Sequence, residues 1–217
     1  MSVSWLIPVR DGDRWLEASI ASALAECGPS DEVVVVDDGS VHEPQARSLE
    51  DGRVCLIRQK PLGIAAALER GRAVCRNPYI ARLDADDIAL PGRIAAQKQL
   101  LEAHLDVAVV GGAARMVRDD GPVPEGMRRY VAWVNGLTDL HAQLLVESPL
   151  FHPAALMRAS AVDEVGGYRS GDLPEDYDLW LRLVTAGHRL STVSHEVVQL
   201  RDRPDRLTRT DPRYSPE

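Results

Sequence analysis

VVVVDDGS, residues 33–40, is the stretch that decides the fold. Four β-branched residues in a row are typical of a strand that is buried on both faces, as in the parallel sheets of α/β proteins. The run ends abruptly in Asp37 and Asp38 followed by Gly39, a combination typical of a turn. The stretch therefore predicts an interior parallel strand with a polar carboxyl end.

Short apolar runs alternate with helical patterns on both sides of this strand. Residues 3–8, 54–57 and 79–83 predict further strands, and residues 13–25 and 63–75 predict helices. Because strands and helices alternate along the chain, we expect an α/β fold with a mostly parallel central sheet flanked by helices.

The second half of the chain is less regular. A helix is expected over residues 91–104, a strand from residue 107, and a hairpin turning at Asp119-Asp120-Gly121. The remaining expected elements are a helix over 139–146, an extended segment over 151–157 and a helix over 174–186. From Arg201 the sequence RDRPDRLTRTDPRYSPE contains few apolar residues, so we expect an exposed tail.

The composition limits the classes of function. The 217 residues, 45% of them hydrophobic, suffice for one compact domain. A formal net charge of -8 argues against a nucleic-acid-binding protein, which would carry a basic surface. No stretch approaches the ~18 apolar residues needed to span a bilayer, and the first residues lack the pattern of a signal peptide. We therefore expect a cytoplasmic protein.

A group of carboxylates follows the strand predicted at residues 79–83. Asp84, Asp86 and Asp87 repel one another, and a hard divalent cation would remove that conflict. Mg²⁺ or Mn²⁺ takes one or two protein carboxylates and completes its coordination with water and phosphate oxygens. The alternative is a solvated acidic turn that precedes the next helix.

Two more acidic groups accompany this one. Asp37 and Asp38 end a strand, and Glu175 and Asp176 begin a predicted helix, where a favourable interaction with the helix N-terminus is the structural alternative. In open α/β sheets ligands bind beyond the carboxyl ends of the strands. The ends of the first, second and fourth predicted strands should therefore converge on one site, near residues 8–11, 37–40 and 84–87.

Seven motifs follow one another along residues 3–186. They are IPVRDGDRWLEASIASAL, VVVVDDGS, GIAAALERGRAVCRNPYIARLDADD, PGRIAAQ, FHPAALMR, VGGYR and EDYDLWLRL. In this order they resemble the landmarks of bacterial family 2 glycosyltransferases with the GT-A fold. The resemblance implies an inverting, metal-dependent transfer of a sugar from a nucleotide diphosphate sugar, a UDP-sugar being favoured, to an acceptor hydroxyl in cell-surface glycan synthesis. The implied cofactor is Mn²⁺ or Mg²⁺.

The resemblance also implies roles for the matched residues. Nucleotide contacts are implied for Pro8, Val9, Arg10, Asp38, Asp84 and Ala85. Asp86 is the implied metal ligand, and Asp87 is a substitute for either Asp84 or Asp86 in its role. In the ED pair the second member, Asp176, is the implied catalytic base, with Glu175 beside it.

Some positions keep two interpretations. His152 matches a motif and is a candidate acceptor-side contact, whereas a hydrogen-bonded core histidine is the alternative. Arg206 and Arg209 are candidate diphosphate contacts, because an acidic protein that binds a diphosphate needs local positive charge. The tail would then close over the donor as a lid, with a solvated linker as the alternative.

We expect a single domain over residues 1–200, followed by the polar tail at 201–217. Within the domain, residues 1–90 would bind the nucleotide and residues 91–200 the acceptor. The acceptor could be a glycan, a lipid-linked sugar or a small molecule, with peripheral membrane contact through it. Many relatives continue beyond this point, so we expect a minimal enzyme or a shortened chain.

Two other functions stay open at this stage. The first is a non-catalytic binding module on a glycosyltransferase fold. The second is a sugar-phosphate nucleotidyltransferase, which would carry a glycine-rich phosphate loop after its first strand, where this chain has IPVRDGDRW.

Overall fold

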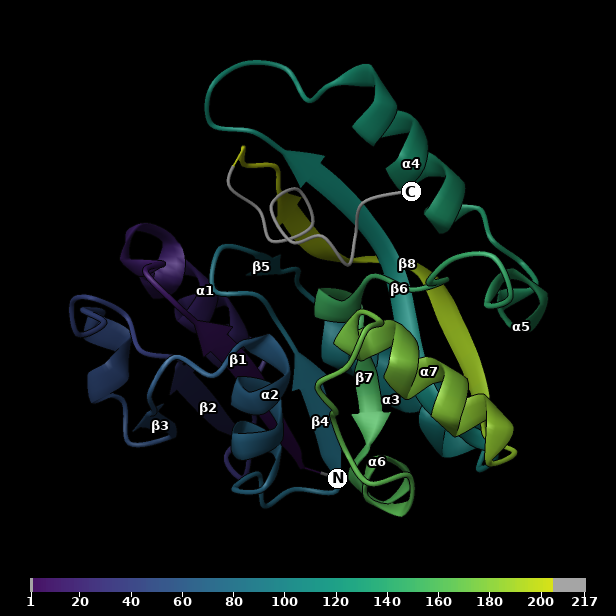
Figure 1. Cartoon of the computed structure of the whole chain (residues 1–217), viewed down its shortest axis with the longest axis horizontal. Coiled ribbons are helices and arrows are strands. Elements are labelled where there is room, and N and C mark those ends of the chain that lie inside the picture. Colours follow the sequence, from purple (N-terminus) through teal and green to yellow (C-terminus); the bar gives the residue numbers. More distant parts are fainter. Residues whose placement is uncertain (1, 205–217) are drawn as a thin grey trace.

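The structure is a computed structural model that describes residues 2–204. Its first half contains β1 (Val3–Val9), α1 (Asp13–Ala25), β2 (Glu32–Asp37), η1 (Arg47–Glu50), β3 (Val54–Arg58), α2 (Ile64–Arg72), β4 (Tyr79–Arg82) and β5 (Ile88–Ala89). Its second half contains α3 (Arg93–Ala103), β6 (Val107–Val117), α4 (Glu125–Asn135), α5 (Leu140–Gln143), η2 (His152–Ala154), β7 (Leu156–Arg158), α6 (Ala159–Glu164), α7 (Glu175–Thr185) and β8 (Arg189–Arg201). All eight strands join in one sheet, in the order β3-β2-β1-β4-β7-β6-β8-β5 (Figure 1).

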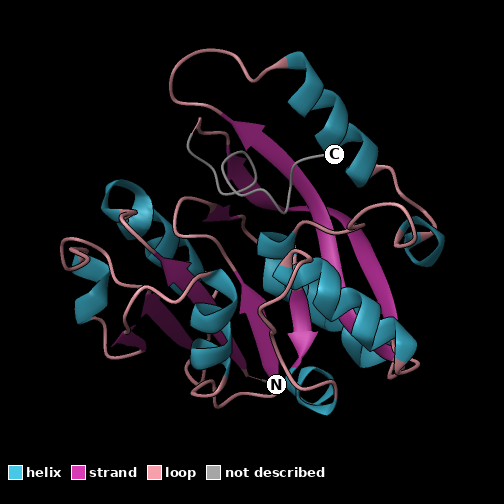
Figure 2. Cartoon of the chain, viewed as in Figure 1, coloured by secondary structure: helices cyan, strands magenta, loops and turns pink. Residues whose placement is uncertain are grey.

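The parallel set β3-β2-β1-β4 is built from the apolar runs of the first half. Every residue of β1 and β2 is buried, as predicted for strands covered on both faces. Side chains alternate along β1, so that Trp5 and Ile7 pack with α1 and α3, while Leu6 packs with α2 and α7. Helices therefore flank the sheet on both sides (Figure 2), which confirms the predicted α/β fold.

Helix α2 lies unusually close to the sheet. A side chain at Gly71 would place its Cβ 2.2 Å from Leu6 Cδ1 and 2.8 Å from Val36 Cγ2, so only glycine fits this position. The predicted helix over 63–75 is shortened at both ends to Ile64–Arg72. Among the described residues, no helix combines the length and apolar character needed to cross a bilayer.

The strands of the second half pair with strands that are distant in the sequence. β7 is antiparallel to both β4 and β6, whereas β6 runs parallel to β8 up to the pair Val117 and Arg201. The hairpin predicted at Asp119-Asp120-Gly121 is wrong, because β6 is followed by a loop and α4, and its partners come from later strands. The sequence pattern around the turn carried no sign of these distant partners.

Two further expectations need correction. The segment 151–157 is extended only at its end, since His152–Ala154 form the short helix η2. The exposed tail expected from Arg201 does not begin there: β8 extends to Arg201, and Asp202 is buried, with its amide donating to the carbonyl oxygen of Val117 at 2.8 Å. Pairing of β5 with β8 brings this chain end beside residues 84–87.

Candidate functional site

The carboxyl ends of β1, β2 and β4 converge as predicted. The amide of Asp38 donates a hydrogen bond to the carbonyl oxygen of Val9 at 2.9 Å, which joins the ends of β2 and β1. The hydroxyl of Ser19, on the helix after β1, donates to the carbonyl oxygen of Asp84 at 2.8 Å. The residues predicted to bind a nucleotide and a metal therefore share one edge of the sheet.

Asp37 belongs to the structure of the turn that follows β2. Its fully buried carboxylate accepts hydrogen bonds from the Ser40 amide at 2.9 Å and the Ser40 hydroxyl at 2.5 Å. The guanidinium of Arg58 donates to the other oxygen at 2.8 Å. Gly39 has a φ of 74°, which the turn requires and which favours glycine. Residues 37–40 thus form a turn with internal donors, called here the first acidic turn.

The carboxylate of Asp38 accepts hydrogen bonds from the segment before α2. One carboxylate oxygen accepts from the Gln59 amide group at 2.7 Å and from the Leu62 backbone amide at 2.8 Å, and the other accepts from the Gly63 amide at 2.8 Å. Asp38 is also buried. A carboxylate oxygen can accept two hydrogen bonds, so a nucleoside contact would use the remaining capacity of the oxygen bound to Gly63.

The other predicted nucleotide contacts differ in what they offer. Pro8 and Val9 are buried within β1, and Ala85 is buried after β4, so these residues can shape a site but present little side chain to it. Arg10 is exposed over 57% of its side chain and lies 4.0 Å from Asp11. Among these four residues, Arg10 is the one that offers an exposed charged group.

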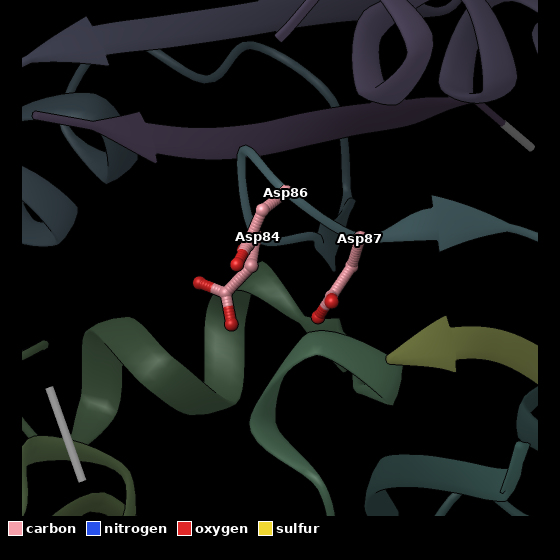
Figure 3. A group of neighbouring side chains, drawn as sticks. All are labelled: Asp84, Asp86 and Asp87. Carbon is pink, nitrogen blue, oxygen red and sulfur yellow. The ribbon is translucent and has the colours of Figure 1, made fainter. Parts of the chain in front are cut away.

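The turn after β4 carries the predicted metal-binding group. Asp84, Asp86 and Asp87 each present a carboxylate oxygen, and the three oxygens lie within 4.8 Å of one another. Figure 3 shows the three side chains projecting to the same side of the turn. Oxygen ligands at this spacing suit Mg²⁺ or Mn²⁺, which keep other positions for phosphate oxygens. We call these residues the aspartate cluster.

Each member of the aspartate cluster contacts a different basic residue. Arg82 Nη1 lies 2.6 Å from Asp84 Oδ1, and Arg203 Nε lies 2.8 Å from an oxygen of Asp86. The backbone amide of Arg201 donates to Asp87 at 2.8 Å. The repulsion expected among the three carboxylates is therefore offset in part by the protein itself.

Arg82 is a buried cation that the sequence left without a role. Its side chain is only 3% exposed although it stands at the end of a strand. Burial acts to lower the pKa of its guanidinium, but the adjacent Asp84 carboxylate, together with Tyr168 and Glu175, outweighs burial and raises it. Arg82 is therefore a fixed positive charge behind Asp84.

The two residues of the ED pair at the start of α7, Glu175 and Asp176, lie in different environments. Glu175 is buried, and its carboxylate lies 3.7 Å from His152 Nδ1, while His152 Nε2 lies 2.9 Å from the hydroxyl of Tyr168. Burial acts to raise the pKa of Glu175, but the proximity of His152 and the positive charge of Arg82 outweigh burial, so this pKa is lowered. Glu175 and His152 thus form a buried polar chain, the core alternative predicted for the histidine.

Asp176, the next residue, behaves in the opposite way. Its side chain is half-buried at the first turn of α7. Burial raises the pKa of this carboxyl, His152 opposes that shift, and the neighbouring Glu175 carboxylate adds to it. A carboxyl with a raised pKa accepts a proton more readily, which suits a general base.

Trp15 contacts the last described residues of the chain. The guanidinium carbon of Arg203 lies 4.6 Å from the centre of the Trp15 ring, and that of Arg201 lies 5.6 Å from it. The Trp15 indole donates to Asp119 at 3.2 Å, and Arg201 also forms an ion pair with Asp119. These contacts hold residues 201–203 beside the aspartate cluster. Arg206 and Arg209, the predicted diphosphate contacts, lie outside the described residues.

Arg93 is a second buried residue whose role the sequence did not reveal. Its guanidinium donates to the carbonyl oxygens of Pro153 at 2.9 Å and Arg82 at 2.8 Å, and it stacks over Trp5 at 4.9 Å. Arg93 thereby ties the end of β4 to η2, which carries His152. The signal available was its place in PGRIAAQ, one of the motifs in the ordered set.

Curated relatives match most of the chain. It is 29% identical over 199 residues to the amylovoran biosynthesis glycosyltransferase AmsE of Erwinia amylovora, covering 89% of this chain and 73% of that protein. It is 25% identical over 205 residues to the UDP-Gal:alpha-D-GlcNAc-diphosphoundecaprenol beta-1,3-galactosyltransferase of Escherichia coli, covering 92% and 73%.

Solved structures share the fold at low sequence identity. TarS 1-349 of S. aureus in complex with UDP-GlcNAc superposes with a TM-score of 0.72 at 15% identity, over 95% of this chain and 60% of that one. The mannosyltransferase PcManGT of Pyrobaculum calidifontis, in complex with GDP-Man and Mn²⁺, gives 0.72 at 18% identity, over 91% and 56%. This chain thus spans less than two thirds of either solved structure, and its fold is GT-A.

The family model described as glycosyl transferase family 2 matches residues 4–166. That range includes the first acidic turn, the aspartate cluster and His152. The chain belongs to glycosyl transferase family 2.

Proposed function

We propose that this protein is an inverting, metal-dependent glycosyltransferase that moves a sugar from a UDP-sugar to an acceptor hydroxyl. The observation that carries the proposal is the aspartate cluster, whose carboxylate oxygens lie within 4.8 Å of one another beside the converging ends of β1 and β2. A nucleotide site, a cation site and a base are the parts that a metal-assisted group transfer requires.

Asp86 is the proposed principal ligand of Mn²⁺ or Mg²⁺, with Asp84 and Asp87 as the other members of the site. When bound, the metal would neutralise the negative charge that develops on the leaving diphosphate. Asp84 stays oriented by its ion pair with Arg82, and Asp87 by the Arg201 amide. Nucleoside contacts are proposed for Asp38 and Arg10.

Asp176 is the proposed base, because it combines partial exposure with a raised pKa. It takes the proton from the acceptor hydroxyl as that oxygen forms its bond to the anomeric carbon. The bond between the anomeric carbon and the diphosphate oxygen breaks on the opposite face, which inverts the anomeric centre. Glu175 is the proposed positioning partner, held in the core by His152.

The named relatives support the choice of donor and setting. One similar protein is named as a UDP-Gal-using transferase, and one similar structure holds UDP-GlcNAc. A third neighbour binds GDP-Man with Mn²⁺, so the nucleobase is the least constrained part of the proposal. The similarity to an amylovoran biosynthesis enzyme supports a role in cell-surface polysaccharide synthesis.

The C-terminal segment is the proposed source of positive charge for the diphosphate. Arg201 and Arg203 lie beside the aspartate cluster, and guanidinium groups bind phosphate through paired hydrogen bonds. We extend the same proposal to Arg206 and Arg209 further along the tail.

The base assignment tests this function. A thermal-shift panel of UDP, GDP and dTDP sugars with Mn²⁺ first selects the donor, since a ligand at 100 times its Kd adds about 2.7 kcal/mol of stability. With that donor, Asp176→Asn should retain nucleotide affinity and lose transfer by at least ~10²-fold, because the base acts on the acceptor. Normal transfer by Asp176→Asn with an inactive Glu175→Gln would reverse the two roles, and full activity in both would refute the base.

A further inference from the structure

The side chain of Arg203 contacts one carboxylate oxygen of Asp86. Its Nε lies 2.8 Å from an Asp86 carboxylate oxygen, in a contact where the two side chains are only 23% and 15% exposed. Asp86 is the residue to which the metal is assigned above. A guanidinium and a divalent cation so close together would repel each other strongly.

The three basic partners of the aspartate cluster differ in their freedom to leave. Arg82 is buried, so its pairing with Asp84 is fixed. The Arg201 amide is part of the backbone at the end of β8 and is held by the sheet. Arg203 follows the last backbone contact with β6, made by Asp202, and reaches Asp86 through a flexible side chain. Of these three contacts, the one made by Arg203 comes from a side chain that is neither fully buried nor part of the sheet.

We propose that Arg203 is an exchangeable counter-cation that holds Asp86 in the metal-free protein and transfers to the donor diphosphate when the metal binds. This inference rests on the proposed function, because it takes the same aspartate cluster as the metal site. Arg203 would therefore weaken the binding of the metal ion alone and strengthen the binding of the nucleotide together with the metal ion.

Charge and packing favour the exchange. The three carboxylates of the cluster present oxygens within 4.8 Å of one another, and such a concentration of negative charge attracts a cation. When the donor binds after the divalent ion, its diphosphate gives Arg203 a new anionic partner. A guanidinium group binds phosphate through two parallel hydrogen bonds. Stacking on Trp15, at 4.6 Å, keeps the side chain near the site in either position.

One substitution should then change the two affinities in opposite directions. In Arg203→Gln the competition for Asp86 is gone, so Mn²⁺ alone should bind at least ~5-fold more tightly than in the unmodified chain. The same variant lacks the diphosphate contact, so UDP in saturating Mn²⁺ should bind at least ~5-fold more weakly. Loss of a purely structural contact would not tighten metal binding.

The experiment measures free Mn²⁺ by electron paramagnetic resonance, and UDP affinity by calorimetry, on the full chain. Arg203→Lys keeps the charge and should lie between the unmodified chain and Arg203→Gln in both affinities. The matched control is Arg129→Gln on α4, where Arg129 pairs with Glu125 of the same helix. In this variant the affinities for Mn²⁺ and for UDP should both stay unchanged. Thermal unfolding of each variant verifies that it is folded.

The outcomes separate this inference from the function on which it rests. Mn²⁺ binding that is equal or weaker in Arg203→Gln overturns the exchange, even where Asp86→Asn abolishes Mn²⁺ binding and so supports the metal site. Equal UDP affinity in Arg203→Gln also overturns it. Mn²⁺ binding that Asp86→Asn leaves intact refutes the metal site itself, and the exchange with it.

Discussion

The first acidic turn and the aspartate cluster look alike in sequence and differ in their partners. Both follow buried parallel strands, and both place aspartates at the same edge of the sheet. In the first acidic turn, backbone amides, a hydroxyl, the Gln59 amide group and Arg58 supply the donors. In the aspartate cluster, guanidinium groups contact two of the three members, Arg82 at Asp84 and Arg203 at Asp86, and the three carboxylates also lie close to one another.

The difference teaches how to separate a structural acidic turn from a cation site. At Asp37, neutral donors of Ser40 within the turn hold one carboxylate oxygen, and the guanidinium of Arg58 on the neighbouring strand pairs with the other. At the aspartate cluster three carboxylate oxygens lie within 4.8 Å of one another, and it is this crowding for which we propose an exchangeable positive charge. Composition alone does not distinguish the two cases.

The largest expected effect is on stability, and it falls on the first acidic turn. Asp37→Ala leaves buried donors of Ser40 and the half-exposed Arg58 without their acceptor, so the free energy of unfolding should fall by about 2 to 3 kcal/mol. Asp86→Ala loses the ion pair with Arg203 but also relieves the repulsion from Asp84 and Asp87, so its stability should change by less than about 1 kcal/mol. Urea unfolding of both variants measures the difference. Equal losses in the two would show that the comparison is wrong.

A smaller effect is expected at Asp38. Asp38→Asn keeps the shape of the side chain but turns an amide donor toward the backbone amides of Leu62 or Gly63. The free energy of unfolding should fall by about 1 to 2 kcal/mol, a typical cost for a buried donor that loses its acceptor. Urea unfolding beside Asp11→Asn, a matched change at the exposed loop after β1, provides the control. An unchanged stability would mean that Asp38 contributes little to the fold.

The smallest expected effect is a gain at Asp176. Its pKa is raised in the folded protein, mainly by burial, so the charged form is disfavoured there. This carboxyl stabilises the fold only while protonated, and that contribution is lost as pH rises from about 3.9, the unfolded value, through the folded pKa. At neutral pH Asp176→Asn should thus add up to about 1 kcal/mol of stability, screened by solvent.

Unfolding experiments at two pH values check the sign of this effect. The gain in Asp176→Asn should shrink as the pH falls through the raised pKa of Asp176, because the carboxyl of the unmodified chain then takes up its proton in the folded state. A loss of stability at neutral pH would mean that Asp176 makes a favourable ionic contact, and its pKa would then be lowered.

The sequence predicted the first half of the fold because its signals are local. The four valines of β2 identify a buried strand by themselves, and α1 begins and ends where its periodicity does. β8 escaped prediction because its apolar residues are unevenly spaced: Leu190, Val197 and Val198 face the core around a bulge that breaks the alternation. Its partner β6 is also distant in the sequence, so no turn signal joined the two.

The candidate site was predictable in its motifs and not in its partners. Asp84, Asp86 and Asp87 stand together in the sequence, so their grouping was certain once the strand before them was identified. Trp15 and Arg203 come from opposite ends of the described chain and meet because β8 runs beside β6 and β5 up to Arg201. Spacing in sequence carries no information about such contacts.

Calorimetry of UDP binding tests the central claim, a metal-assisted nucleotide site at the aspartate cluster, most directly. The titrations compare UDP with Mn²⁺, UDP with EDTA, and UDP with Mn²⁺ in Asp86→Ala. We predict that Mn²⁺ tightens UDP binding by at least ~10-fold, equal to about 1.4 kcal/mol, and that Asp86→Ala lowers the affinity to the level measured in EDTA. Equal affinity in all three titrations would contradict the claim.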